Sequence, residues 1–309
     1  MARSKAEFDF DVAIVGAGPA GLSAAIVLGR SRRSVALFDH GKPRNYAAHA
    51  VHCYLGHEGI EPATLRERGR REAESYGVRF FDSEVIAACC TSNEKTEGTR
   101  FEVRTSGGPI YVRAVLLATG IVDALPDIPN VREFYGRSIH HCPYCDGWEH
   151  RDQNLAALGT GSAAAKLALS LRTWSPHATA CSNGSTIDAA DRQRLTDNGI
   201  GWREELVCGL EGTDGSLSQI IFQSGPPLQC DALFFNTDKA QHSPLAEMLG
   251  CERAEDDLVQ SEEKQRTCVD GLFVAGDADG DTQFAIVAAA EGAIAATAIN
   301  ALLQKQDLR

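Results

Sequence analysis

The 309-residue sequence lacks three features that would each assign it to a well-known class of protein. The first is an excess of basic residues, because 42 Asp and Glu outnumber 30 Lys and Arg and give a formal net charge of −12. A protein with that charge does not attract nucleic acid or an anionic membrane surface. We therefore expect no nucleic acid and no membrane among its partners.

The second missing feature is a long apolar segment. Residues 1–11 are polar and mixed in charge, without the apolar core of a signal peptide. The best apolar run, at 284–296, is interrupted by Glu291 and is shorter than a membrane span. These observations favour a cytoplasmic location, where most of the ten cysteines would be reduced and buried as small apolar residues.

The third missing feature is a second Cys-x-x-Cys pair to accompany Cys142-Pro143-Tyr144-Cys145. Structural zinc needs four ligands, so one pair is incomplete unless distant histidines complete the site. Cys89 and Cys90 are adjacent, which is poor ligand spacing, and we predict no metal site. An inert buried pair is an alternative. Redox chemistry is favoured, because a thiolate forms readily at such a pair and exchanges with disulfides.

A glycine-rich loop near the amino terminus follows the short apolar run Phe10–Val15, which is typical of a buried parallel strand. A second apolar run ends at an aspartate about twenty residues further on, as in dinucleotide-binding folds. The glycines permit a tight turn and close approach of a pyrophosphate to a helix N-terminus, while the carboxylate accepts from ribose hydroxyls. The predicted dinucleotide-binding residues here are Gly16, Gly18, Pro19, Ala20, Gly21 and Asp39.

A second loop of this kind follows the cysteine pair and contains Gly159, Gly161 and Ala164. The next predicted strand ends in the segment 182–184, which offers neither an acidic group for ribose hydroxyls nor a basic group for a phosphate. Three outcomes stay open for this loop: weakly bound NADH, a second flavin dinucleotide or another ADP-containing ligand, and no ligand.

Two further turns follow apolar strands. One is Ala118-Thr119-Gly120, and the other is Gly276-Asp277, which precedes an alanine-rich helix predicted from about Phe284 to Leu303. An aspartate at such a strand end can hold a polyol while the helix dipole faces an electron-rich ring, although a capping aspartate is the alternative. The length and the two loops predict an α/β protein with two Rossmann-like, three-layer domains.

Together these motifs resemble the low-molecular-weight thioredoxin reductase family of flavoproteins over essentially the whole chain. The resemblance rests on the Gly16–Gly21 loop, Ala118-Thr119-Gly120, Cys142–Gly147, the Gly159 loop, the hinge His242-Ser243-Pro244, and Gly276-Asp277. It implies an FAD-binding domain formed by residues 1–122 and 245–309, and an NAD(P)-binding-like domain at 123–244 that carries the cysteine pair. It also implies a homodimer.

The resemblance assigns roles to individual residues. Cys145 would face the flavin, Cys142 would exchange with the external dithiol or disulfide, and Asp146 would donate or accept the proton. Histidine is the other candidate for the proton, because its ordinary pKa lies near neutrality. His140 and His141 both lie just before Cys142, and His141 is the favoured one. Asp277 would bind the ribityl chain of FAD.

The sequence departs from the family pattern where NADPH would bind. NADPH-dependent members carry an arginine-rich cluster after the second strand of this domain, whereas residues 181–186 here contain no basic residue. Ser162 and Lys166 replace the acidic residues of the family around the second loop, and Gln283-Phe284-Ala285 replaces the usual Arg-Gln-Ala. These features resemble the nicotinamide-independent branch, which includes dithiol oxidases.

The sequence therefore predicts an FAD-dependent thiol-disulfide oxidoreductase in which electrons pass between a dithiol or disulfide substrate, Cys142–Cys145 and FAD. The substrate is a small molecule or a thioredoxin-like protein, and NADPH is not used efficiently. Two alternatives stay open: an NAD(P)H-dependent thioredoxin reductase and a flavin-bound redox sensor.

Overall fold

The computed structural model describes residues 8–91, 100–236, 239–254, 258–280 and 282–308. The chain divides into two compact units. Unit 1 comprises Met1–Tyr46, Cys53–Val122 and Lys239–Arg309, and unit 2 comprises Ala47–His52 and Asp123–Asp238. The boundaries predicted from the sequence differ from these: residues 239–244 were expected in the second domain, and residues 47–52 in the first. The backbones of Gly136 and Ala47 touch, because a side-chain carbon on Gly136 would lie 2.3 Å from the Ala47 carbonyl oxygen.

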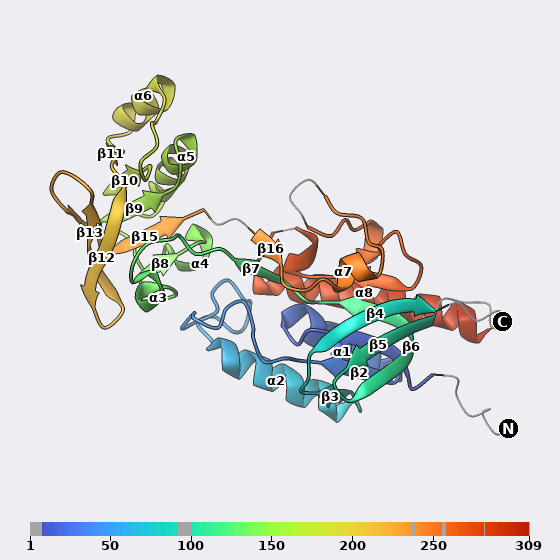
Figure 1. Cartoon of the computed structure of the whole chain (residues 1–309). Helices are drawn as coiled ribbons and strands as arrows, with labels where there is room; N and C mark the ends of the chain where they lie inside the picture. The colour runs from blue at the N-terminus through green and yellow to red at the C-terminus, as the bar shows by residue number, and fades with distance from the viewer. Residues whose placement is uncertain (1–7, 92–99, 237–238, 255–257, 281, 309) are drawn as a thin grey trace. The chain divides into compact units, whose positions relative to one another are not determined.

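Unit 1 is formed by both ends of the chain (Figure 1). Its strands are β1 (Phe10–Val15), β2 (Val35–Phe38), β3 (Arg79–Phe81), β4 (Val85–Thr91), β5 (Arg100–Thr105), β6 (Gly108–Leu117), β7 (Ile121–Asp123), β16 (Lys239–Gln241) and β17 (Leu272–Val274). Its helices are α1 (Pro19–Arg30), α2 (Pro62–Ser75), α7 (Leu245–Met248) and α8 (Ala285–Asp307), with short 3-10 turns η1 (Glu263–Gln265) and η2 (Asp277–Asp279). The polar turn predicted at 92–99 lies outside the described residues.

The main sheet of unit 1 has the strand order β3-β2-β1-β6-β5-β4, and β17 also pairs with β6. Strands β3, β2, β1, β6 and β17 run parallel, whereas β5 pairs antiparallel with β6 and β4 pairs antiparallel with β5. Because the carboxyl ends of parallel strands share one edge, the segments after β1, β2, β6 and β17 meet there. These segments contain the residues predicted to bind the first dinucleotide.

Alternate residues of β1 supply two different cores, as expected for a strand buried on both faces. Val12 and Ile14 join one apolar cluster with α1 and α8, whereas Ala13 and Val15 join another with β4–β6 and α7. Unit 1 is thus a helix layer, a parallel sheet and an antiparallel layer. The α/β fold predicted from the sequence is confirmed.

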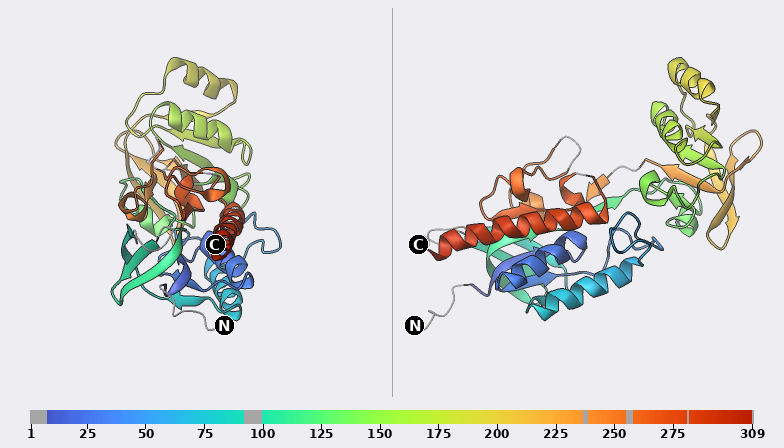
Figure 2. Two further views of the ribbon diagram at one scale, coloured as in Figure 1. Left: turned by 90° about the vertical axis from the view of Figure 1, so that its right-hand side faces the viewer. Right: turned by 180° about the vertical axis from the view of Figure 1, so that it is seen from behind.

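Helix α8 lies alongside α1, as Figure 2 shows. The contact is close, because a side-chain carbon on Gly292 would lie 2.0 Å from the Ala20 carbonyl oxygen. The helix extends beyond the predicted end at Leu303 to Asp307, and its length and apolar composition alone would suffice to cross a membrane. In this fold one side of it belongs to the unit 1 core, with Ala295, Ala296 and Ile299 buried.

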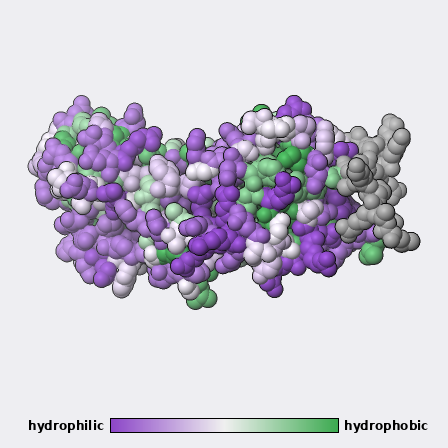
Figure 3. Space-filling view, turned by 90° about the horizontal axis from the view of Figure 1, so that it is seen from below, coloured by the Kyte–Doolittle hydropathy of each residue, from purple (hydrophilic) through white to green (hydrophobic). Residues whose placement is uncertain are grey.

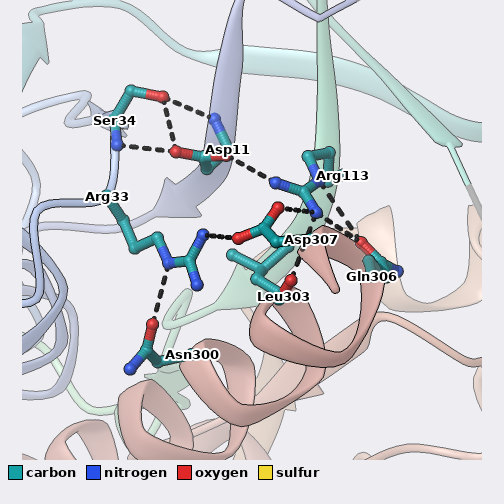
Figure 4. Close-up of polar contacts among 8 residues, drawn as sticks. All are labelled: Asp11, Arg33, Ser34, Arg113, Asn300, Leu303, Gln306 and Asp307. Atoms are coloured by element: carbon teal, nitrogen blue, oxygen red, sulfur yellow. Dashed lines mark hydrogen bonds and ion pairs between the residues drawn. The ribbon is translucent and has the colours of Figure 1, made fainter. Parts of the chain in front are cut away.

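The carboxyl end of α8 is tied to the sheet by charged side chains (Figure 4). Asp307 forms ion pairs with Arg33 at 2.6 Å and with Arg113 at 2.8 Å. Arg113 also pairs with Asp11 at 2.9 Å, and Asp11 accepts hydrogen bonds from the backbone N–H and the hydroxyl of Ser34. The network therefore joins three segments that are far apart in the sequence.

Unit 2 consists of strands and short helices from the middle of the chain. Its helices are α3 (Val131–Phe134), α4 (Pro143–Asp146), α5 (Ser162–Leu171) and α6 (Ala189–Asp197), and its strands are β8 (Ile139–His140), β9 (Leu155–Leu158), β10 (Ala178–Cys181), β11 (Gly201–Arg203), β12 (Val207–Thr213), β13 (Ser216–Phe222), β14 (Leu228–Gln229) and β15 (Ala232–Phe235).

A parallel sheet in the order β11-β10-β9-β15-β8 forms the centre of unit 2, and a three-stranded antiparallel sheet, β12-β13-β14, accompanies it. Helix α5 packs on one face of the parallel sheet, where Ala164, Ala168 and Leu171 are buried. The antiparallel strands pack on the other face, in a cluster that includes Leu210 and Ile220. The second predicted Rossmann-like domain is therefore present.

The face of the molecule in Figure 3 is mainly hydrophilic, with apolar side chains exposed in smaller, separate areas.

Candidate functional site

The first glycine-rich loop joins β1 to α1. Gly16 has φ +110°, and a side-chain carbon there would lie 2.1 Å from the Ala118 carbonyl oxygen. A side-chain carbon on Gly21 would lie 1.9 Å from the Gly16 carbonyl oxygen. Packing thus demands glycine at both positions. Gly18 differs, because no atom lies within 4 Å of the place where its side-chain carbon would be.

Gly18 is also the N-cap of α1, and as a glycine it has no side chain with which to cap this helix end. Pro19 follows, so the helix begins with a residue that has no N–H to satisfy. The remaining N–H groups of the first turn have no intrahelical partner, and the helix dipole favours negative charge beside them. Open space at Gly18 and an uncapped helix end together fit a pyrophosphate.

The predicted turn Ala118-Thr119-Gly120 lies next to this loop. The Ala118 N–H donates to the Val15 carbonyl at 2.9 Å, and Gly120 has φ +66°. Asp39, at the end of β2, accepts from the Gly41 N–H at 2.9 Å and pairs with Arg66 at 2.7 Å. The parallel strands therefore place the loop, the turn and Asp39 along one sheet edge.

The fourth part of this edge is the segment after β17. Arg44 donates to Asp277 at 3.0 Å and to the side-chain oxygen of Gln283 at 2.9 Å. The Gln283 amide nitrogen is buried without a hydrogen-bond partner among the described residues, and the same holds for Arg66 Nε. Both are donors that a bound polar molecule would satisfy. Phe284 is the N-cap of α8, and Ala285 begins the helix.

The residues present in unit 1 therefore fit FAD. The uncapped α1 terminus and Gly18 suit a pyrophosphate, Asp39 suits ribose hydroxyls, and Asp277 suits the ribityl hydroxyls. Arg44 was not predicted as part of the site. Its place in the loop at 42–46 gives no sequence signal, since only the tertiary fold brings it to Asp277.

In unit 2, Cys142 and Cys145 form a disulfide with a Cα–Cα distance of 5.3 Å. Cys142 is the N-cap of the short helix α4, and the Cys145 N–H donates to Cys142 Sγ at 3.1 Å. This hydrogen bond favours the thiolate form of Cys142 when the disulfide is reduced. Gly147 is packed so closely that a side-chain carbon would lie 2.4 Å from the Pro143 carbonyl oxygen.

The two candidates for the proton have different neighbours. Asp146 contacts Nδ1 of the buried His140 at 3.3 Å. His141 instead lies beside Tyr135, with 3.1 Å between the hydroxyl and Nδ1, and 3.9 Å from Asp123. The structure thus pairs Asp146 with His140 and not with the favoured candidate His141. His140 continues to His150, with 3.0 Å between the Nε2 atoms.

The second glycine-rich loop joins β9 to α5. Gly161 has φ +49°, and its N–H donates to the Ser185 hydroxyl at 2.7 Å. Gly159 lies against the helix, because a side-chain carbon there would be 2.9 Å from the Ala164 nitrogen. The segment that follows β10 therefore already occupies one of the N–H groups that a pyrophosphate would use.

Charged residues around that segment are paired with one another. Arg192 binds Glu204 through two contacts of 2.6 and 2.9 Å, and Arg203 binds Glu205 at 3.0 Å. Glu204 also accepts from the Ile187 N–H at 2.7 Å. That hydrogen bond, together with Arg192, holds the pKa of the Glu204 carboxyl below its ordinary value. Residues 181–186 contain no acidic side chain, as the sequence shows, but the carboxylate of Glu204, which follows β11, comes next to this segment at Ile187.

Three histidines, at positions 49, 52 and 57, lie close together in the sequence and are potential metal ligands. His52 lies 3.6 Å from Glu149, and no group of three potential metal ligands occurs among the residues that the structure describes. In unit 1 the ring of His242, from the predicted hinge, stacks on His40 with 4.7 Å between centroids. Burial, with the charges of His40 and Lys42, lowers the pKa of His242.

Comparison with known proteins gives consistent matches. The pyridine nucleotide-disulphide oxidoreductase family matches residues 10–292. A probable thioredoxin reductase of Arthroderma benhamiae is 31% identical over 306 residues, which cover 89% of this chain and 75% of that protein. The crystal structure of HlmI has a TM-score of 0.91 at 34% identity, covering 99% of this chain and 96% of HlmI. A putative thioredoxin reductase TrxB from Bacillus anthracis has a TM-score of 0.89 at 32% identity, covering 96% and 99%.

Proposed function

The chain belongs to the pyridine nucleotide-disulphide oxidoreductase family and is a thioredoxin reductase-like, flavin-dependent disulfide oxidoreductase, and from this premise we propose that it works without efficient use of NADPH. Electrons then pass between a dithiol or disulfide substrate, Cys142–Cys145 and FAD. Bound FAD supplies the two-electron chemistry, and the protein positions the sulfur atoms and the proton carrier.

The observation that carries this proposal is the pairing of Arg192 with Glu204 beside the second loop. Binding of a 2'-phosphate would have to draw Arg192 away from a carboxylate that also caps the Ile187 N–H, and would leave that carboxylate next to the phosphate. Each charge-assisted phosphate contact that is lost costs about 1.5–3 kcal/mol. Two such contacts amount to roughly 10²–10⁴ in affinity.

Ser185 adds a smaller effect at the same loop. A ligand must replace the hydrogen bond from the Gly161 N–H to the Ser185 hydroxyl. The net value of such an exchange is only about 0.5–1.5 kcal/mol. The engagement of Arg192 by Glu204 therefore decides the outcome for NADPH. Weak binding of NADH is less disfavoured, because its free ribose hydroxyls could donate to Glu204.

The residues of unit 2 support the exchange chemistry. Attack of a thiolate on the disulfide breaks the Cys142–Cys145 bond and leaves one cysteine as a thiolate. We propose Cys142 as the sulfur that exchanges with substrate, because in the reduced pair the Cys145 N–H favours a Cys142 thiolate, the form that attacks a disulfide. Asp146 is proposed as the proton carrier. The proposed working form is a cytoplasmic homodimer, on the resemblance alone.

An anaerobic titration tests the proposal against an NAD(P)H-dependent thioredoxin reductase. We expect excess NADPH to bleach the flavin absorbance slowly in stopped-flow mixing, whereas dithiothreitol, as the dithiol probe, reduces it completely. NADH is measured in parallel. Fast and saturable bleaching at micromolar NADPH would establish the ordinary reductase. Failure of dithiothreitol to reduce the flavin, with Cys142–Cys145 intact, would instead favour the redox sensor.

A further inference from the structure

Asp146, His140, His150 and Gln153 form a continuous chain of hydrogen-bonding side chains within unit 2. His140 ends β8, where it pairs in register with Phe234, and its side chain is only 5% exposed. Its Nδ1 lies 3.3 Å from Asp146 Oδ1, and its Nε2 lies 3.0 Å from His150 Nε2. The line ends where His150 Nδ1 lies 2.9 Å from the side-chain oxygen of Gln153, an exposed contact.

Packing against Phe234 and a contact with a backbone carbonyl fix the orientation of the two imidazole rings. The Phe234 ring lies 5.5 Å from the His140 ring and 6.3 Å from the His150 ring. The Arg137 carbonyl lies 3.1 Å from His140 Nε2 and accepts a hydrogen bond when that nitrogen carries the proton. Asp146 and the partner imidazole are the titratable groups that these contacts place against each histidine. A buried imidazole fixed on both nitrogens is positioned for transfer of a proton along the ring.

The contacts admit two complementary proton arrangements. In the first, Asp146 carries a proton and donates to His140 Nδ1, His140 Nε2 donates to His150 Nε2, and His150 Nδ1 donates to Gln153. In the second, His150 Nε2 donates to His140 Nε2, and His140 Nδ1 donates to the Asp146 carboxylate. Moving each proton by one hydrogen bond converts the first into the second and releases one proton from His150 Nδ1.

We propose that His140 and His150 form a proton relay that connects Asp146 to solvent during thiol-disulfide exchange. The inference rests on the proposed function, because it requires the cysteine pair to exchange with a thiol. A substrate dithiol and the enzyme disulfide give the substrate disulfide, one cysteine thiol, one cysteine thiolate and one proton. Two electrons move from the substrate sulfurs to the cysteine pair, and the relay carries the released proton away.

The environment of His150 suits the outer position. Burial lowers the pKa of His150, and the hydrogen bond to Gln153 only partly opposes this effect. His150 is therefore neutral near pH 7 and can accept a proton, which an imidazolium cannot do. His140 and His150 are positioning and proton-transfer residues behind Asp146.

The experiment measures reduction of the Cys142–Cys145 disulfide by dithiothreitol, with alkylation quenching and mass spectrometry, so that it does not depend on flavin turnover. We expect His150→Ala to slow reduction about tenfold at pH 7, a part of the 10²–10⁴ that acid–base groups contribute. Added imidazole should restore the rate, and the deficit should shrink above pH ~8.5, where an ordinary thiol ionises without a base. His177→Ala, an exposed histidine of the same unit, is the control.

His150→Gln separates proton transfer from a structural role, because the amide can keep a hydrogen bond but cannot pass a proton. We expect it to be as slow as His150→Ala. Wild-type rates in both variants, or a slow His150→Ala that imidazole does not rescue while His150→Gln is normal, would overturn the relay. A wild-type disulfide that dithiothreitol does not reduce would overturn the proposed function itself, which is a distinct result.

Discussion

Replacement of Gly18 by alanine separates what the fold needs from what the cofactor needs. Gly18 has φ −77°, which alanine adopts without strain, and its added methyl group would meet no protein atom within 4 Å. Replacing glycine by alanine at the N-cap costs roughly 0.5–1 kcal/mol, and the less flexible unfolded chain recovers about 0.4–1 kcal/mol. The free energy of unfolding of the apoprotein should therefore change little.

FAD binding should respond differently to the same change. The methyl group would fill the space that we assign to the pyrophosphate, at the uncapped end of α1. Loss of one charge-assisted hydrogen bond costs about 1.5–3 kcal/mol, which corresponds to roughly 10- to 150-fold in affinity. Titration of apoprotein with FAD, followed by flavin fluorescence, measures this loss, and urea unfolding followed by circular dichroism measures stability.

Two other glycines provide matched controls. A side-chain carbon on Gly209 also meets no atom within 4 Å, but it lies in β12 of unit 2, so Gly209→Ala should change neither quantity. Gly21→Ala should destabilise the apoprotein itself, because its carbon would lie 1.9 Å from the Gly16 carbonyl oxygen. Unchanged FAD affinity in Gly18→Ala would refute the assignment of this loop to the pyrophosphate.

Two further predictions concern stability and thiol reactivity. Burial alone would raise the pKa of the Asp307 carboxyl, but hydrogen bonds from Arg33 and Arg113 outweigh it and lower the pKa. The stability that Asp307 contributes is therefore present above the pKa of the unfolded state and is lost as the pH falls through the pKa of the folded state. The side chain is 42% exposed and screened by solvent, so Asp307→Asn should lower the free energy of unfolding in urea by about 1 kcal/mol at pH 7 and by less in acid. An equal loss at both pH values would contradict this prediction. Burial raises the pKa of Cys181 to about 12, and the Cys230 thiol is also buried. A maleimide at pH 8 should therefore modify the exposed Cys53, Cys208 and Cys268 in native protein but spare Cys181 and Cys230. Rapid labelling of Cys181, detected by mass spectrometry, would count against the packing of unit 2.

The sequence predicted those parts of the site that are local in the chain. The Gly16–Gly21 loop and the Cys142–Cys145 pair can be recognised from the sequence, because dinucleotide binding and disulfide formation each need residues only a few positions apart. The α/β fold followed from the same loops, since each requires a strand before it and a helix after it. The predicted roles of Cys142, Cys145, Asp146 and Asp277 stay predictions.

What the sequence could not predict depends on contacts between distant segments. Nothing in the spacing of Arg44 and Asp277 indicates that they pair, and Glu204 reaches Ile187 only because β10 and β11 are neighbours. The choice between His140 and His141 turned on strand alternation. β8 directs His140 into the core toward Asp146, and the next residue contacts Tyr135 instead.

The closure of unit 1 by α8 has a consequence for biosynthesis. The ribosome completes all of unit 2 before it makes residues 239–309, so unit 2 can fold while unit 1 still lacks β17, α8 and the partners of Arg33 and Arg113. Until then the apolar faces of β1 and α1 stay uncovered. We therefore expect these faces to be prone to aggregation in the nascent chain, and the proposed FAD site to be complete only after Asp277 and α8 have been made.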